Sequence, residues 1–305
     1  MKKKLGIILP CFNESEIIDK SITKLLSVIS DLKDYKSTIV LIDDGSSDAT
    51  WSKISQACSK NEKSITGVKL IQNVGKDKCL IEGIKSFKFD IYITMDIDGE
   101  HPFEGIKDLI NRYEKGSNLV LGVRENFNDS FFIKQLKKFY YFIFKAINYK
   151  KYQSSDFRLF SHRVKEMTIS HFSHLNYYKP IFDYINLDEE YYFYNSKKNT
   201  DKKKSKFNLI SLVNYAFTNL TFYNVKFLNI SIMISILICF VYFINIILTS
   251  IGINETFIGL LNKLSLLLTF FMLLIFTIYL KNIYEILLSN NRSKIVEIIN
   301  KNNAE

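Results

Sequence analysis

Three carboxylates occur at alternate positions in one short acidic segment of the chain. They are Asp96, Asp98 and Glu100, and they directly follow the apolar run Ile91–Met95. Alternate side chains of an extended backbone point to the same side, so these carboxylates can converge on a hard divalent cation. Mg²⁺ is usually held by one or two carboxylates and completes its shell with substrate phosphates. The segment therefore predicts a site for a metal and a phosphorylated substrate, with a solvated acidic turn as the alternative.

Polar residues also follow other apolar runs in the first part of the chain. These residues are Asn13, Glu14, Asp43, Asp44 and Arg124. The chain contains neither a G-x-G-x-x-G fingerprint nor a P-loop motif, which disfavours NAD binding and P-loop chemistry. The four cysteines show no C-x-x-C spacing, so neither a zinc site nor a disulfide framework is expected.

The elements that must position these residues alternate along the chain. The predicted strands are Leu5–Leu9, Thr38–Ile42, Val68–Ile71, Ile91–Met95 and Leu119–Gly122, and the predicted helices are Ser15–Ile29, Thr50–Ser59, Lys76–Phe87 and Phe103–Lys115. This alternation predicts an α/β fold, a mostly parallel sheet with helices on both faces. Ligands of such sheets bind at the carboxyl ends of the strands, where the polar residues fall.

Two long apolar segments follow. Phe227–Asn254 carries no charge, and Thr256–Leu280 is apolar apart from Lys263. A bilayer core needs about 20 helical residues, so both segments can span it. We expect two transmembrane helices rather than two buried helices of a soluble domain. Lysines cluster outside the turn between them, and this bias predicts a protein of the cell (inner) membrane with both termini and the active site in the cytoplasm.

The basic charge is concentrated near these segments. Lys+Arg 41 against Asp+Glu 31 gives a net charge of +10, which indicates an anionic partner. Because the lysines lie beside apolar segments, a lipid surface is favoured over nucleic acid. The segment Phe131–Lys150 places lysines, including Lys134 and Lys137, opposite an apolar face. It is typical of an interfacial helix, although a helix packed on the domain core has the same period. Leu209–Leu220 is also amphipathic.

Five motifs in order resemble one enzyme family. They are Pro10-Cys-Phe-Asn-Glu14, Asp43-Asp-Gly-Ser-Ser-Asp48, Asn73-Val-Gly-Lys76, Asp96-Ile-Asp98 and Ser155-Asp-Phe-Arg-Leu159. In order and spacing the chain resembles family 2 glycosyltransferases, within them the polyprenyl-phosphate group that contains bactoprenol glucosyltransferases and dolichol-phosphate mannose synthase. The resemblance implies a GT-A-like fold.

For the sugar donor, the resemblance implies a nucleotide-sugar site and a metal. The implied nucleotide-sugar-binding residues are Pro10, Phe12, Glu14, Ile42, Asp44, Asp96, Ile97, Asp98 and Arg124. It implies a Mg²⁺ or Mn²⁺ that bridges the diphosphate, with a ligand set drawn from Asp98, Glu100 and Asp96. Glu100 stands where relatives often carry Gln, which adds negative charge to this site.

For the acceptor, the resemblance implies a catalytic role for Asp156. A helix N-cap is the alternative for this residue, because Asp is a good cap. We expect Arg158, Lys134 and Lys137 to contact the acceptor phosphate.

The implied reaction is an inverting transfer of a sugar to undecaprenyl or other polyprenyl phosphate. A UDP-sugar, UDP-glucose first, is the expected donor; UDP-GlcNAc, UDP-galactose and GDP-mannose stay open. The alternatives are a processive polysaccharide synthase and a non-catalytic membrane scaffold. Paired spans and amphipathic helices favour a homo-oligomer. The expected divisions are a nucleotide-sugar-binding half (1–130), an acceptor side with interfacial helices (131–225), two transmembrane helices (226–281) and a cytoplasmic tail (282–305).

Overall fold

A computed structural model describes most of the chain. The described residues are 2–125, 155–169, 187–196, 225–251, 255–289 and 294–301, with single positions at 135, 138, 178 and 182. The chain divides into two compact units. The first comprises residues 1–130, 150–205 and 288–305, and the second comprises residues 131–149 and 206–287. The sheet belongs to the first unit, and two long apolar helices belong to the second.

The predicted alternation of strands and helices is confirmed in the first unit. Its elements are β1 (Lys3–Cys11), α1 (Ile18–Ser30), β2 (Tyr35–Asp43), α2 (Thr50–Lys60), β3 (Ile65–Leu70), α3 (Lys76–Ser86), β4 (Ile91–Thr94), α4 (Gly105–Glu114), β5 (Leu119–Arg124), β6 (Arg158–Ser161), α6 (His162–Met167), β7 (Glu190–Tyr194) and β8 (Ile295–Ile299). The strands from β1 to β5 are runs of buried aliphatic side chains, as expected for a sheet covered on both faces.

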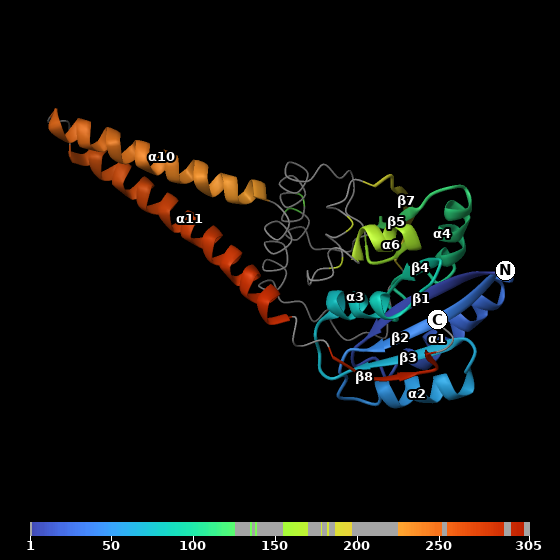
Figure 1. The fold of residues 1–305 in the computed structure, drawn as a ribbon. Coiled ribbons are helices and arrows are strands. Elements are labelled where there is room, and N and C mark those ends of the chain that lie inside the picture. Colours follow the sequence, from blue (N-terminus) through green and yellow to red (C-terminus); the bar gives the residue numbers. More distant parts are fainter. Residues whose placement is uncertain are drawn as a thin grey trace. The chain divides into compact units, whose positions relative to one another are not determined.

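The described strands form one sheet in the order β7-β5-β6-β4-β1-β2-β3-β8 (Figure 1). The four strands β4, β1, β2 and β3 are mutually parallel, so their carboxyl ends lie at one edge of the sheet. β6 is antiparallel to both β4 and β5, with Thr94 opposite Arg158. The chain just before β6 therefore lies at the edge where β4 ends. Through this reversal, Asp156 can meet residues that follow the parallel strands.

The core lies in two layers, one on each face of the sheet. On one face, α1, α2 and α4 pack on β1 and β2 through side chains such as Leu25, Ile54 and Leu109. On the other face, α3 and α6 contribute Leu80, Ile84 and Val164. Both faces of the sheet are thus covered, as the α/β prediction requires.

The chain returns to the sheet after the long apolar helices. β8 pairs antiparallel with β3 (Figure 1), although the sequence analysis predicted only a tail there. Asn300 holds the segment that contains β8 against the rest of the sheet. Its side-chain amide donates to the carbonyl oxygens of Cys58 and Ile65, each at 3.0 Å. The carbonyl oxygen of Asn300 accepts from the Thr66 hydroxyl at 3.1 Å. Residues on both sides of the apolar helices therefore belong to one sheet.

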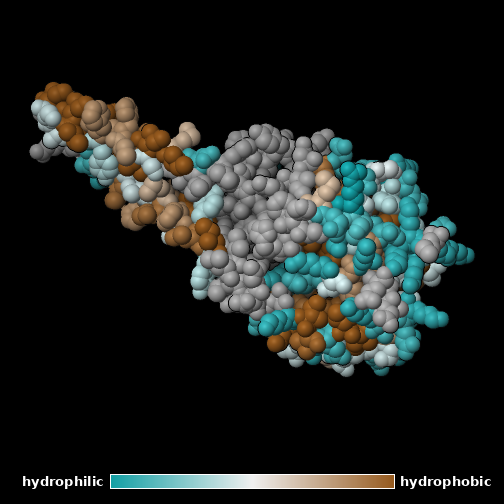
Figure 2. Space-filling view, viewed as in Figure 1, coloured by the Kyte–Doolittle hydropathy of each residue, from teal (hydrophilic) through white to brown (hydrophobic). Residues whose placement is uncertain are grey.

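The second unit contains the helices α10 (Val225–Ser250) and α11 (Glu255–Ser289). Within them, Ile232–Ser250 and Gly259–Lys281 are long and apolar enough to cross a membrane, and few of their side chains are buried. Figure 2 shows hydrophobic side chains along their visible surface. The helices contact each other through a hydrogen bond of 2.5 Å from the Asn245 amide to Asn262 Oδ1. The predicted amphipathic helices Phe131–Lys150 and Leu209–Leu220 lie outside the described residues, apart from positions 135 and 138, which are helical and exposed.

Candidate active site

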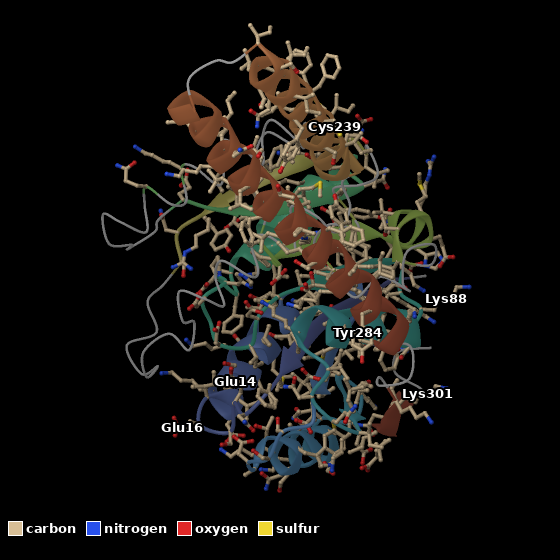
Figure 3. The ribbon with its side chains drawn as sticks, turned by 90° about the vertical axis from the view of Figure 1, so that its left-hand side faces the viewer. Glu14, Glu16, Lys88, Cys239, Tyr284 and Lys301 are labelled. Carbon is tan, nitrogen blue, oxygen red and sulfur yellow. The ribbon has the colours of Figure 1, made fainter. Side chains whose placement is uncertain are left out.

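The loops after β1 and β2 are tied together at the carboxyl edge of the sheet. Asn13 adopts a positive φ of 53°, and its Oδ1 accepts from the Ser47 amide at 2.9 Å. The amide of Glu14 (labelled in Figure 3) donates to the Thr50 hydroxyl at 2.9 Å. These bonds hold the loop that carries Phe12, whose ring is 40% exposed. An exposed aromatic ring on a fixed loop offers a surface on which a planar base can stack.

Two buried carboxylates lie at the carboxyl end of β2, where Asp43 is the last residue of the strand and Asp44 follows it. Asp44 accepts hydrogen bonds from the amides of Val74 (2.8 Å) and Gly75 (3.1 Å), one to each carboxylate oxygen. Burial outweighs these bonds and raises the pKa of Asp44 to about 6. Asp43 is fully buried; its Oδ1 accepts from the Ser46 amide, while its Oδ2 has no hydrogen-bond partner among the described residues. Burial raises the pKa of Asp43 as well.

Lys76 forms ion pairs with two acidic residues at this edge, Asp96 and Asp156. Its ammonium lies 2.5 Å from Asp96 Oδ1 and 2.5 Å from Asp156 Oδ2. Lys76 begins α3 directly after Gly75, whose φ of 89° favours glycine at the turn from the strand edge into the helix. Desolvation opposes the charge of Lys76, but the two carboxylates overcome it and raise the pKa of Lys76. The ion pair therefore joins the loop after β3, the end of β4 and the segment before β6.

His101 is buried and contacts Asp96 and Phe157 next to this ion pair. Its Nδ1 accepts a hydrogen bond from the Asp96 amide at 2.9 Å, and its ring stacks on Phe157 with a centroid distance of 5.4 Å. Burial lowers the pKa of His101, which favours the neutral ring that can accept at Nδ1. His101 directly follows the acidic segment in sequence, and none of the five motifs includes it.

Asp98 and Glu100 flank a tight turn beside Arg124. Asp98 Oδ1 accepts from the Glu100 amide at 2.9 Å, and Gly99 between them has a φ of 78°. Arg124, at the end of β5, donates to Glu100 Oε2 at 3.2 Å. Among the described residues, no three His, Cys, Asp or Glu side chains converge as a ready ligand set. Asp96 is paired with Lys76 and Glu100 with Arg124, while Asp98 and Glu100 lie two residues apart on one turn. Carboxylates in this arrangement are of the kind that hold a divalent cation arriving with substrate phosphates, and the ligand set of Asp96, Asp98 and Glu100 stays a prediction.

Asp156 lies in the bend before β6, and its carboxylate is 6% exposed. The helix-cap alternative is wrong, because the next helix is α6 and its N-cap is Ser161, whose hydroxyl accepts from Val164 N. The bend packs closely on β5. The amide of Ser155 donates to Gly122 O at 2.7 Å, and a Cβ on Gly122 would lie 2.6 Å from Phe157 O. Glycine at position 122 therefore allows this close approach.

The remaining predicted residues fall into three groups. Ile42 and Ile97 are buried beneath the edge, and Pro10 pairs with Ile42 at the end of β1. Arg158 is fully buried, with its guanidinium over the rings of Tyr178 and Phe182, so its role towards an acceptor phosphate stays a prediction. Lys134 and Lys137 lie outside the described residues. The structure thus brings Asp43, Asp44, Lys76, Asp96, Asp98, Glu100, Arg124 and Asp156 to one edge of the sheet.

Residues 6–178 match the family model described as glycosyl transferase family 2. The chain belongs to this family and is a glycosyltransferase. It is 31% identical over 231 residues to the uncharacterized glycosyltransferase YkoT of Bacillus subtilis (strain 168), which covers 72% of this chain and 68% of that protein. It is also 31% identical over 166 residues to the bactoprenol glucosyl transferase of Shigella phage SfV, covering 53% of each chain.

Solved structures similar to this chain include glucosyl-3-phosphoglycerate synthase from Mycobacterium tuberculosis in complex with Mn²⁺ and UDP-glucose. The TM-score is 0.48 with 14% identity, over 72% of this chain and 79% of that one.

Proposed function

We propose that this chain transfers a sugar, glucose from UDP-glucose in the first instance, to a polyprenyl phosphate at the cytoplasmic face of a membrane. The observation that carries the proposal is the convergence of Asp98, Glu100 and Asp156 at one strand edge, in a chain with two helices apolar enough to span a bilayer. The relatives named bactoprenol glucosyl transferase support the choice of sugar and lipid.

The loops after β1 and β2 would hold the nucleoside. Phe12 is exposed and offers a face on which the base can stack. The resemblance implies that Asp44 binds the nucleotide sugar. Its two bonds to the loop amides instead support a role in shaping the pocket wall.

Asp98 and Glu100 would hold Mg²⁺ or Mn²⁺, with Arg124 beside them. When bound, the cation supplies positive charge to the diphosphate leaving group. Arg124 pairs with Glu100, and a guanidinium at this place is the kind of group that binds phosphate oxygens. Glu100 in place of Gln adds a negative charge that Arg124 offsets.

The transfer itself requires an oxygen of the lipid phosphate to attack the anomeric carbon. The new bond joins that oxygen to the sugar, the bond from the sugar to the diphosphate breaks, and the nucleoside diphosphate leaves with the electron pair. A lipid phosphate is already ionised at pH 7, so no strong base is required. Asp156, paired with Lys76, would therefore orient the sugar or acceptor. Lys76 also lowers the repulsion between two carboxylates and the incoming phosphates.

The fold supports a topology with both flanks of the apolar helices on the same side of the membrane, and the lysine bias of the sequence favours the cytoplasm as that side. β1 to β5 precede these helices and β8 follows them, yet all belong to one sheet. An even number of crossings is required for such a sheet. A cysteine at position 254 should be labelled by an impermeant thiol reagent from outside intact cells, and one at position 303 should not. The native Cys11, Cys58 and Cys79 are buried, while the exposed Cys239 on α10 would be replaced first (Figure 3). The reverse labelling would contradict this topology.

The proposal is tested with membranes that contain the full chain. They are incubated with labelled UDP-glucose, UDP-GlcNAc, UDP-galactose or GDP-mannose, with and without added undecaprenyl phosphate. We expect label in a lipid extract with one donor, dependent on the added lipid. Label in a long polymer would favour the processive polysaccharide synthase. Absence of transfer from every donor would favour the scaffold.

A further inference from the structure

The hydroxyl of Thr94 determines which groups donate and which accept in a short hydrogen-bond chain that ends at the carbonyl oxygen of Asp156. Thr94, the last residue of β4, is fully buried, and its Oγ1 donates to the carbonyl oxygen of Asp156 at 2.7 Å. The same Oγ1 lies 2.8 Å from the hydroxyl of Tyr178. A threonine hydroxyl has one proton, and the carbonyl cannot supply one. Tyr178 is therefore the donor to Thr94, and Thr94 is the donor to Asp156.

A second contact fixes the backbone one residue earlier. Arg158 Nε donates to the carbonyl oxygen of Ser155 at 2.9 Å. Its guanidinium lies over the rings of Tyr178 at 5.1 Å and Phe182 at 4.9 Å. The Tyr178 ring is thus held by Arg158, and its hydroxyl is aimed at Thr94. Two consecutive carbonyl groups of the bend, those of Ser155 and Asp156, are bound by this cluster.

We propose that Tyr178, acting through Thr94, is a positioning residue that holds Asp156 in the orientation in which its carboxylate meets Lys76. None of the five sequence motifs contains Tyr178 or Thr94. Tyr178 comes from the segment that sequence analysis assigned to the acceptor side, so the chain links that segment to the site. This inference rests on the glycosyl transfer proposed above, in which Asp156 orients a reactant.

The test compares three variants of the full chain that remove or keep single hydroxyls. Tyr178→Phe removes the first donor, Thr94→Val removes both bonds with little change in volume, and Thr94→Ser keeps a hydroxyl. With UDP-glucose and undecaprenyl phosphate, we expect Tyr178→Phe to lower kcat about fivefold and Thr94→Val about tenfold, the scale of one hydrogen bond. The KM for UDP-glucose should change less than about twofold, since only a transition-state interaction is lost. Thr94→Ser should restore most of kcat.

Tyr92→Phe is the matched control. Tyr92 is buried on the same strand, and its hydroxyl donates to Phe87 O at 3.1 Å and accepts from Phe89 N at 3.0 Å, at the opposite end of β4. Its loss should lower thermal stability as much as Tyr178→Phe does, with kcat unchanged. In an Asp156→Ala background, Tyr178→Phe should have no further effect on kcat, because residues that act together are non-additive.

Hydrogen exchange of the backbone separates this inference from the proposed function. A peptide covering residues 155–158 should exchange faster in Tyr178→Phe than in wild type, and not in Tyr92→Phe. If the wild-type chain fails to glycosylate undecaprenyl phosphate while this exchange pattern holds, the acceptor assignment falls and the positioning stands. Unchanged exchange, or equal kcat values for Tyr178→Phe and Tyr92→Phe, would overturn the positioning role.

Discussion

The two sides of the candidate site reach the same edge of the sheet by different routes. On the donor side, Asp44 and Asp98 each follow a parallel strand within a few residues, and short bonds to backbone amides hold them there. On the other side, Asp156 follows residues 126–154 in sequence. It reaches the edge because the next strand, β6, is antiparallel to both β4 and β5. The donor side is built from local turns. The Asp156 side depends on a long-range strand insertion and on a buried cluster behind it.

This difference predicts different responses to substitution. Changes on the donor side should alter nucleotide and metal binding, because the loops bind the donor directly. Changes on the Asp156 side should alter the rate of transfer and leave donor binding intact. Lys76 contacts both Asp96 and Asp156, so its substitution should affect both properties.

The largest effect is expected for Asp98→Ala. Loss of a metal-holding carboxylate should lower turnover by roughly 10³-fold or more, since a divalent cation supplies several kcal/mol to the transition state. Mn²⁺-dependent binding of UDP, measured by calorimetry, should be lost as well. Asp31→Ala is the control, because Asp31 forms an exposed ion pair with Lys107. Normal metal-dependent UDP binding in Asp98→Ala would remove the role assigned to this residue.

The next effect is expected for Asp156→Asn. The amide keeps the shape of the side chain but loses the charge that pairs with Lys76. We expect kcat to fall by roughly 10²-fold, the size of effect that misplacing a reacting group by about 1 Å can have. The dissociation constant of UDP-glucose should stay near that of wild type. A variant that loses donor binding instead would move Asp156 to the donor side and abolish the contrast between the two sides.

Lys76→Met should show the connection between the sides. Without the ammonium, Asp96 and Asp156 are two like charges at a partly buried site, so the pKa of one carboxyl should rise. The carboxyl pair then takes up a proton as the pH falls towards neutrality, and the rate of transfer should decrease on the acidic side. We expect kcat to fall about tenfold or more at pH 6.5 and to recover partly at pH 8.5. A pH–rate profile parallel to that of wild type would contradict this role.

Asp44→Asn tests the donor side through stability. The pKa of Asp44 is raised to about 6 from its model-compound value of 3.8, so between these values the folded chain binds more protons than the unfolded chain. The contribution of Asp44 to stability is therefore greatest below pH 4 and is lost as the pH rises towards 6. The loss is on the order of 1 kcal/mol per pKa unit. Asp44→Asn should flatten the dependence of Tm on pH across this window; an unchanged slope would argue against it.

The smallest effect is expected in the apolar helices. Asn245→Leu removes the hydrogen bond to Asn262 between α10 and α11. Polar contacts between membrane helices contribute about 0.6 kcal/mol on average, so Tm should fall only slightly. Transfer activity of the folded chain should be unchanged. A large loss of kcat would instead show that Asn245 and Asn262 contribute to the transfer, although they lie on neither the donor side nor the Asp156 side.

The same difference explains what could be predicted from sequence. β1 to β5 and the helices between them were predictable because apolar runs and helical periods are local signals. Asp98 and Arg124 were predictable because parallel strands end at a common edge. β6 and β8 were missed, since an antiparallel insertion and a returning strand depend on distant pairing partners. Lys76 belonged to a recognised motif, but its contact with Asp156 depends on β6, and Tyr178 carries no local signal.

A single-turnover experiment tests whether the sugar passes from UDP-glucose to the lipid phosphate in one step. The full chain in detergent is loaded with Mn²⁺ and less than one equivalent of UDP-glucose labelled in the sugar, and undecaprenyl phosphate is then added. We expect label to enter the lipid extract at the rate at which UDP is released, one sugar for each UDP, and Asp156→Asn to slow both equally. UDP release without labelled lipid, or label in a polymer, would contradict it.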